Sequence, residues 1–158
     1  MADFIVWMQQ TPLSVFLRES GSVWGFPLVL FLHTAGLALL VGSSLVVNAR
    51  MLGVGGELPT APLESLFPIM WTGFWLNAIS GTILLMASDP SKLLNPLFYV
   101  KMAFIAVAVW LMTREKKQLF GAQAGPAPRW LAVLSLICWF GAIVTGRLLA
   151  YYGKGTRA

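Results

Sequence analysis

Three basic side chains fall within apolar segments of this 158-residue chain, where charged groups are costly. His33 is the only histidine, and it lies in the stretch 20–49, which contains no charged residue. Lys101 and Arg147 lie in two later apolar segments. A neutral imidazole is a metal ligand, and ammonium and guanidinium groups bind carboxylates or phosphates. These residues are therefore the first candidates for a functional site.

The composition predicts that these residues lie in a membrane. Apolar residues make up 58% of the chain, charged residues make up 11%, and the mean hydropathy is +0.76, as is typical of an integral membrane protein. A bilayer core about 30 Å thick is crossed by about 20 apolar residues in a helix. Four segments qualify: 23–47, 65–87, 96–113 and 130–152. We predict an all-α, polytopic membrane protein built as a four-transmembrane-helix up-and-down bundle, because each segment must satisfy its own backbone hydrogen bonds.

The chain divides into three parts around these spans. Residues 1–22 lack the basic start of a signal peptide and alternate apolar with polar positions. They are predicted to form an amphipathic interfacial helix, with a break near Pro12. Residues 23–152 form the transmembrane domain, with short connectors rich in glycine and proline. Residues 153–158 form a short basic tail.

Basic residues near the span ends predict the orientation. One side carries Arg50, Arg114, Lys116, Lys117 and Arg129, and the other carries Arg18, Lys92, Lys154 and Arg157. Basic residues beside short loops tend to stay in the cytoplasm, so the cluster at 114–117 predicts an orientation with both termini in the periplasm. The basic residues are spread over the membrane ends, so lipid is the expected partner and nucleic acid is not.

Depth in the membrane relates the polar candidates to one another. Counted at 1.5 Å per residue from the face that bears the termini, His33 and Ser80 both lie about 12 to 13 Å deep. Asn77 lies about one turn deeper than Ser80, and Lys101 and Arg147 lie about 8 Å deep. The candidates are therefore predicted to share one half of the membrane.

Small residues accompany two of the polar candidates at helical spacing. The stripe of His33 contains Gly36, Leu37, Leu40, Ser43 and Ser44, and the stripe of Asn77 contains Gly73, Ser80 and Gly81. Small residues allow helices to approach closely. The stripes of Lys101 and Arg147 contain larger apolar residues, so the sequence leaves open whether these two side chains face protein or lipid.

A b-type haem would engage all three basic residues. The imidazole of His33 would bind the iron, while Lys101 and Arg147, nearer the surface, would pair with the propionates. One histidine cannot supply two axial ligands, so the second ligand would be Met86, Met102 or a residue of a partner, unless the iron stays five-coordinate. We predict that the protein holds haem b through His33 and takes part in membrane electron transfer.

Three alternatives remain open. Copper would combine His33 with thioethers of the same methionines. A quinone carbonyl would bind to His33 together with Ser80 or Asn77. In the third alternative the protein binds no cofactor and is an accessory or structural subunit, packing against a larger membrane protein or another copy of itself through its small-residue stripes.

Conventional catalytic motifs are absent from the sequence. It contains no HExxH, no glycine-rich phosphate loop and no evident nucleophile with its base. We therefore expect no independent catalytic activity. All six acidic residues are predicted to lie outside the spans, which argues against a proton-coupled transporter. The single cysteine, Cys138, excludes an intramolecular disulfide.

Two segments carry a resemblance to a known family. The first span reads LHTAG at 32–36, VGS at 41–43 and RMLG at 50–53, and the third begins with NPLFYVK at 95–101. With Ser80-Gly81, these motifs resemble an uncharacterised family of bacterial four-helix inner-membrane proteins, over most of the chain. The resemblance implies the architecture and directs attention to His33, Arg50 and Lys101, without implying a substrate. An acidic residue would be expected at Asn48. In layout the chain is also similar to copper-resistance membrane proteins and small membrane cytochromes.

Overall fold

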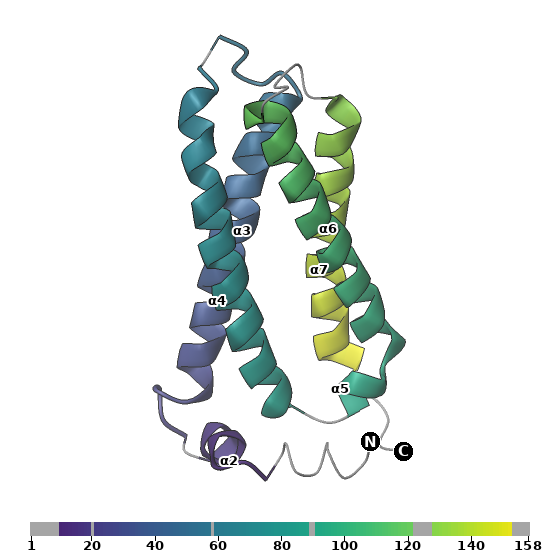
Figure 1. Ribbon diagram of the computed structural model, residues 1–158. Helices are drawn as coiled ribbons and strands as arrows, with labels where there is room; N and C mark the ends of the chain where they lie inside the picture. The colour runs from purple at the N-terminus through teal and green to yellow at the C-terminus, as the bar shows by residue number, and fades with distance from the viewer. Residues whose placement is uncertain (1–9, 20, 58, 89–90, 122–127, 153–158) are drawn as a thin grey trace.

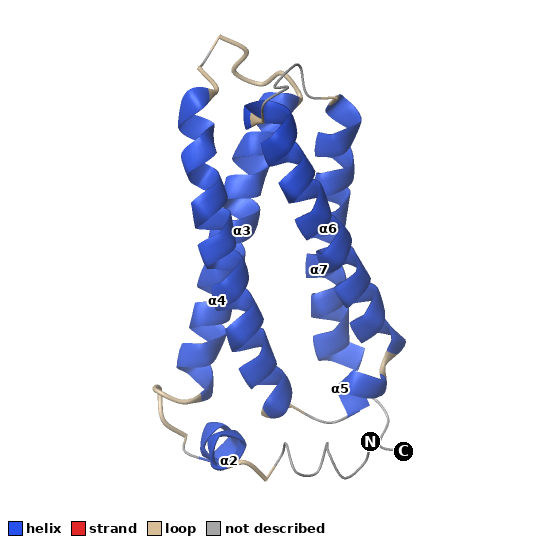
Figure 2. Cartoon of the chain, in the orientation of Figure 1, coloured by secondary structure: helices blue, strands red, loops and turns tan. Residues whose placement is uncertain are grey.

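The computed structural model describes residues 10–19, 21–57, 59–88, 91–121 and 128–152, and within them every regular element is a helix (Figure 2). Four long helices form the bundle: α3 (Phe26–Met51), α4 (Leu66–Met86), α6 (Pro96–Phe120) and α7 (Arg129–Tyr152). The shorter elements are α2 (Pro12–Glu19), the 3-10 helix η1 (Ala61–Ser65) and α5 (Ser91–Leu94). The predicted all-α bundle is confirmed.

Each long helix is able to cross a bilayer. By length and composition α3, α4 together with η1, α6 and α7 are all candidate membrane spans. An apolar helix of this length matches the hydrocarbon thickness, and most of its surface can remain exposed because lipid replaces water as the solvent. The chain is therefore a multi-pass, four-span membrane protein.

The end of the third span differs from the sequence prediction. Helix α6 continues to Phe120, past the predicted end at residue 113. The reason is that Leu111, Met112 and Glu115 extend one buried face of the helix through the charged run 114–117. Glu115 is 0% exposed and lies within the candidate span Pro96–Phe120, so the prediction that all acidic residues lie outside the spans is wrong for this residue.

The helices associate as two antiparallel pairs. Helix α3 packs mainly on α4, α6 packs mainly on α7, and α3 also contacts α7 (Figure 1). Toward the end where α2 lies, α4 and α6 diverge (Figure 1). The pairs follow from the short connectors, which place consecutive helices side by side.

The apolar core fills the half of the bundle away from α2. Its fully or nearly buried members are Leu40, Val47, Met51, Phe67, Met70, Ala108, Leu111, Met112, Leu131, Ala132, Cys138 and Trp139. Helix α6 contributes no buried residue before Ala108. One half of the bundle is thus tightly packed, whereas in the other half α6 is joined to the rest mainly through α7.

Helix α2 lies across the end of the bundle and is seen end-on in Figure 1. It begins at Pro12, a residue tolerated at the first helical position because its missing N–H has no helical partner there. The Ser14 hydroxyl donates to the Met86 carbonyl oxygen at 2.9 Å, and Leu17 is buried, whereas Phe16 is 48% exposed. The helix is amphipathic, as predicted for a short interfacial helix. The remainder of the predicted interfacial segment, residues 1–9, and the tail, 153–158, lie outside the described residues.

Candidate functional site

Helices α3 and α4 touch through their backbones at a pair of glycines. A Cβ atom added at Gly36 would lie 2.8 Å from the Asn77 backbone nitrogen, and one added at Gly73 would lie 2.7 Å from the Leu40 nitrogen. Neither distance is tolerated by a real side chain. The small residues of the two stripes therefore let α3 and α4 approach closely enough for polar groups to bond across them.

His33 and Asn77 form a reciprocal pair across this contact. The His33 Nδ1 atom lies 3.1 Å from the Asn77 carbonyl oxygen, and the Asn77 Nδ2 atom donates to the His33 carbonyl oxygen at 2.8 Å. Ser80 Oγ, on the same helix as Asn77, also lies 3.1 Å from His33 Nδ1. Each residue thus binds the main chain of the other, which fixes the imidazole in rotation as well as in depth.

These bonds determine which imidazole nitrogen carries the proton. The Asn77 carbonyl can only accept, so Nδ1 must donate to it. The Ser80 hydroxyl donates to the Leu76 carbonyl at 2.6 Å, which leaves its oxygen to accept from Nδ1 as well. In the neutral ring Nε2 then carries a lone pair, and no group in the described part of the chain bonds to it.

The imidazole lies directly against α4. A Cβ added at Gly81 would lie 3.0 Å from His33 Cε1 and 3.4 Å from Nδ1. The ring is half-buried, so one edge is held on α4 while the other remains accessible. A side chain larger than glycine at this position would push the ring off its acceptors.

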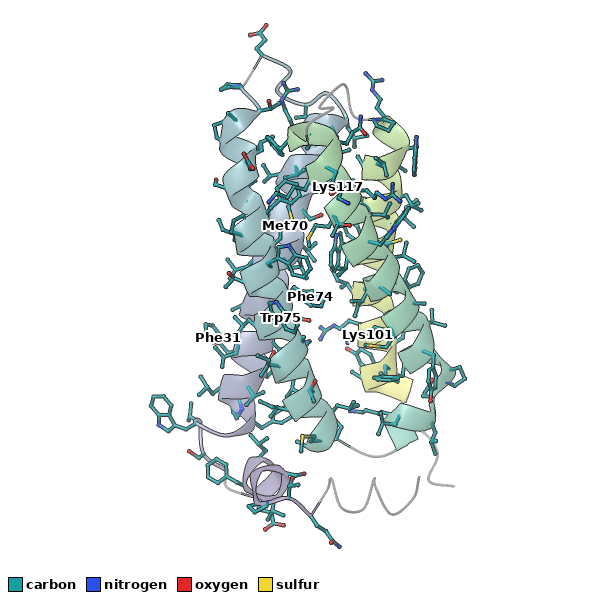
Figure 3. The ribbon with its side chains drawn as sticks, viewed as in Figure 1. Phe31, Met70, Phe74, Trp75, Lys101 and Lys117 are labelled. Carbon is teal, nitrogen blue, oxygen red and sulfur yellow. The ribbon has the colours of Figure 1, made fainter. Side chains whose placement is uncertain are left out.

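Lys101 reaches toward this region from the opposite helix pair. Figure 3 shows its side chain extending from α6 toward α4. Its Cε and Nζ atoms would each lie 3.5 Å from a Cβ added at Gly146 of α7, so the alkyl chain passes over that glycine. Lys101 and His33 are both partly buried, whereas most of the surface of α6 before Ala108 is exposed or half-exposed. The structure therefore brings a cation and the imidazole to the same half of the bundle interior.

Arg147 is the most exposed of the three basic candidates, because its side chain is exposed on α7 whereas His33 and Lys101 are half-buried. The two candidate sulfur ligands are on the other side of the cluster in sequence, Met86 on α4 and Met102 on α6. Met86 follows Ser80 by six residues, about 9 Å along α4. The Met102 side chain is 40% exposed on α6. The described residues thus offer one well-oriented imidazole, held by Asn77 and Ser80.

The donor set fits one axial haem ligand. Metal-bound histidines characteristically donate their other ring N–H to a carbonyl or carboxylate, which fixes the tautomer and raises the basicity of the ligating nitrogen. His33 has this arrangement, with Nδ1 tied to Asn77 and Nε2 open. Lys101, on the opposite helix pair, would supply a cation for a haem propionate. No group of three or more His, Cys, Asp or Glu side chains that could hold a metal ion occurs among the described residues.

The fold and this cluster define the class: a four-span membrane protein with a polar cluster in one half of its bundle. Comparison with protein families, curated proteins and solved structures finds no match to the chain. The resemblance carried by the motifs of the first and third spans therefore stays a prediction.

A second polar cluster, around Glu115, was missed by the sequence analysis. The charged run 114–117 resembles a membrane end, and hydropathy alone ends the span there. The signal that identifies Glu115 is its spacing: it follows Leu111 by four residues and Met112 by three, on the face that both present to the core.

Proposed function

We propose that this protein is a small membrane haem carrier that binds one haem b through His33 Nε2 and takes part in electron transfer. The single observation that supports the proposal is the orientation of the imidazole, with Nδ1 held by the Asn77 carbonyl at 3.1 Å and Nε2 left open. An imidazole that served only to join two helices would gain most by bonding through both nitrogens.

Each residue of the site has a defined part in this proposal. His33 would bind the iron, and Asn77 and Ser80 would keep its ring in the required tautomer and orientation. Lys101 would pair with a propionate by a charge-assisted hydrogen bond. When bound, the haem supplies a one-electron couple, whose potential depends on the axial ligand and on the burial of the group. With one histidine ligand, the second axial position would be empty or filled by another molecule.

The experiment is an absorption spectrum of the protein purified in mild detergent from haem-replete cells, with iron and protein measured together. We expect a Soret band and about one haem per chain. His33→Ala should lose at least 90% of the haem, because it removes the iron ligand. Thr34→Val is the matched control, since Thr34 is exposed beside His33 and its hydroxyl bonds only within its own helix, to the Leu30 carbonyl. A colourless, iron-free wild-type protein would refute the proposal.

The second candidate function is an accessory membrane subunit without a cofactor. The observation that favours it is the reciprocal pairing of His33 and Asn77, which by itself accounts for a polar residue inside a span as a helix-to-helix contact. In that case His33→Ala would leave the protein's spectrum unchanged, and a larger membrane protein or a second copy would co-purify in a fixed ratio. Copper or a quinone in place of haem would be detected by metal analysis or by lipid extraction of the same preparation.

We further propose that the chain lies in a bacterial inner membrane with both termini in the periplasm. The support is the basic cluster at 114–117, which the structure places at the end of the bundle opposite α2. The first and third connectors would then face the cytoplasm.

A further inference from the structure

Glu115 is a fully buried carboxylate without a partner. Its side chain is 0% exposed on α6, and neither Oε1 nor Oε2 accepts a hydrogen bond from any described residue. An isolated ionised carboxylate in an apolar interior is far costlier than one that is paired or bound to a cation. The bundle is therefore incomplete at this position unless something neutralises the carboxylate.

Asn48 presents a second unpaired oxygen in the same cluster. Its Nδ2 atom donates to the Ser44 carbonyl at 2.8 Å, to Ser44 Oγ at 3.0 Å and to Ser135 Oγ at 3.3 Å. These bonds fix the amide, and its Oδ1 atom is buried with no partner. Ser135, which receives the bond from Asn48, also lies beside the Glu115 carboxylate, although no well-formed hydrogen bond joins the two. Asn48 of α3 thus contacts Ser135 of α7, and Ser135 in turn lies beside Glu115 of α6.

The nearest basic residues in sequence are directed elsewhere. The Arg114 guanidinium lies over the Trp110 ring, 4.9 Å from its centroid. The Lys116 ammonium lies 6.0 Å from the centroid of the Phe67 ring. Both neighbours are exposed whereas Glu115 is buried, because adjacent helical positions lie on different sides of the helix. No basic side chain of the described chain satisfies the carboxylate.

We propose that Glu115, Asn48 and Ser135 form a binding site for one small monovalent cation of the sodium class. The donors are all oxygen atoms, which hard cations prefer over nitrogen and sulfur. A single carboxylate supplies one negative charge, so a monovalent ion leaves the site neutral, whereas a divalent ion would leave a buried positive charge.

The position of the cluster provides a route from one side of the membrane. Glu115 lies five residues before the end of α6, about 8 Å from that end, and Asn48 lies three residues before the end of α3. Ions would therefore enter from the side of the first and third connectors. His33 lies on α3 about 22 Å from Asn48 along the axis, so the two sites are separate and the cation site does not depend on the proposed haem.

The test measures the thermal unfolding of the detergent-purified protein in sodium chloride and in choline chloride at equal ionic strength. We expect sodium to raise the Tm of the wild type in a saturable way, by about 5 to 10 °C at a concentration 100-fold above its Kd. Glu115→Gln should abolish this shift. Glu64→Gln is the matched control and should retain it, because Glu64 is an exposed carboxylate on η1.

A second measurement keeps the test valid if Glu115→Gln does not fold: equilibrium binding of radioactive sodium to the wild type, expected at one ion per chain. Equal Tm values in sodium and choline, together with no bound sodium, would overturn the proposal. A Tm that changes with pH but not with sodium would overturn it too, because the carboxylate would then simply carry a proton. His33→Ala should leave sodium binding unchanged, which separates failure of this site from failure of the haem proposal.

Discussion

Replacing Gly73 with alanine tests the contact that positions His33. The added Cβ would lie 2.7 Å from the Leu40 nitrogen and 2.8 Å from the Gly36 carbonyl oxygen. Since ordinary contacts begin at about 3.5 Å, α4 must move away from α3 by about 0.8 Å. The bonds between His33 and Asn77, now 3.1 and 2.8 Å, would lengthen to about 3.6 Å or more, beyond useful hydrogen-bond range.

The expected loss of stability follows from these terms. Hydrogen bonds between membrane helices contribute about 0.6 kcal/mol each on average, and overpacking a close contact costs about 1 to 3 kcal/mol. Gly73→Ala should therefore lower the free energy of unfolding by about 2 to 4 kcal/mol. The assay is unfolding in mixed detergent micelles at increasing sodium dodecyl sulfate, followed by far-ultraviolet circular dichroism.

Gly42→Ala is the matched control for this experiment. Gly42 lies on α3, and a Cβ added there would meet nothing within 4 Å. Alanine is the better helix former, so this variant should be neutral or more stable by up to about 1 kcal/mol. If the two alanine variants unfold at the same detergent fraction, the close contact of α3 with α4 is not as described, and the reasoning about His33 fails with it.

Two further predictions concern the charged side chain at the site and the orientation. Lys101→Met should weaken haem retention about tenfold, the loss expected for a charge-assisted hydrogen bond. Arg147→Met should change haem retention less than twofold, because Arg147 is exposed. Equal losses in a haem titration would contradict the placement of Lys101. The orientation is tested by cysteine labelling in a variant with the buried Cys138 replaced by alanine. Val23→Cys, at an exposed position, should react with a membrane-impermeant maleimide in spheroplasts, whereas Glu57→Cys, also exposed, should react only after lysis. The reverse pattern would show the opposite orientation.

The sequence predicts the fold well because a segment that crosses lipid must satisfy its own backbone hydrogen bonds and is therefore helical. Length and apolar composition identify four helices, and their antiparallel order follows from short connectors. The predicted end of α6 was wrong because hydropathy depends on the charges at 114–117 and not on the direction in which each side chain points. Glu115 faces the core while Arg114 lies over Trp110, a difference set by the 100° step between neighbouring helical residues.

The sequence predicts how deep each site residue lies in the membrane, but only partly which way its side chain faces around the helix axis. The rise per residue fixes the depth of each residue along its helix. His33 and Ser80 were predicted to lie at one level, and in the structure His33 Nδ1 lies 3.1 Å from Ser80 Oγ. The direction in which a side chain faces depends on which helix packs beside it. For α7, no stripe of small residues around Arg147 identified the neighbouring helix. The reciprocal bonding of His33 with the Asn77 main chain requires coordinates, because a sequence pattern does not reveal which carbonyl lies opposite an imidazole.

The central claim is that His33 keeps its proton on Nδ1 and leaves Nε2 unprotonated. Its most direct test is nitrogen-15 magnetic resonance of histidine-labelled protein produced without haem. Because the chain has one histidine, its two ring nitrogens give unambiguous signals. We predict that the neutral ring carries its proton on Nδ1, hydrogen-bonded to Asn77, with Nε2 unprotonated and shifted when haem is added. A proton on Nε2 in the neutral ring, or signals unchanged by haem, would contradict the account.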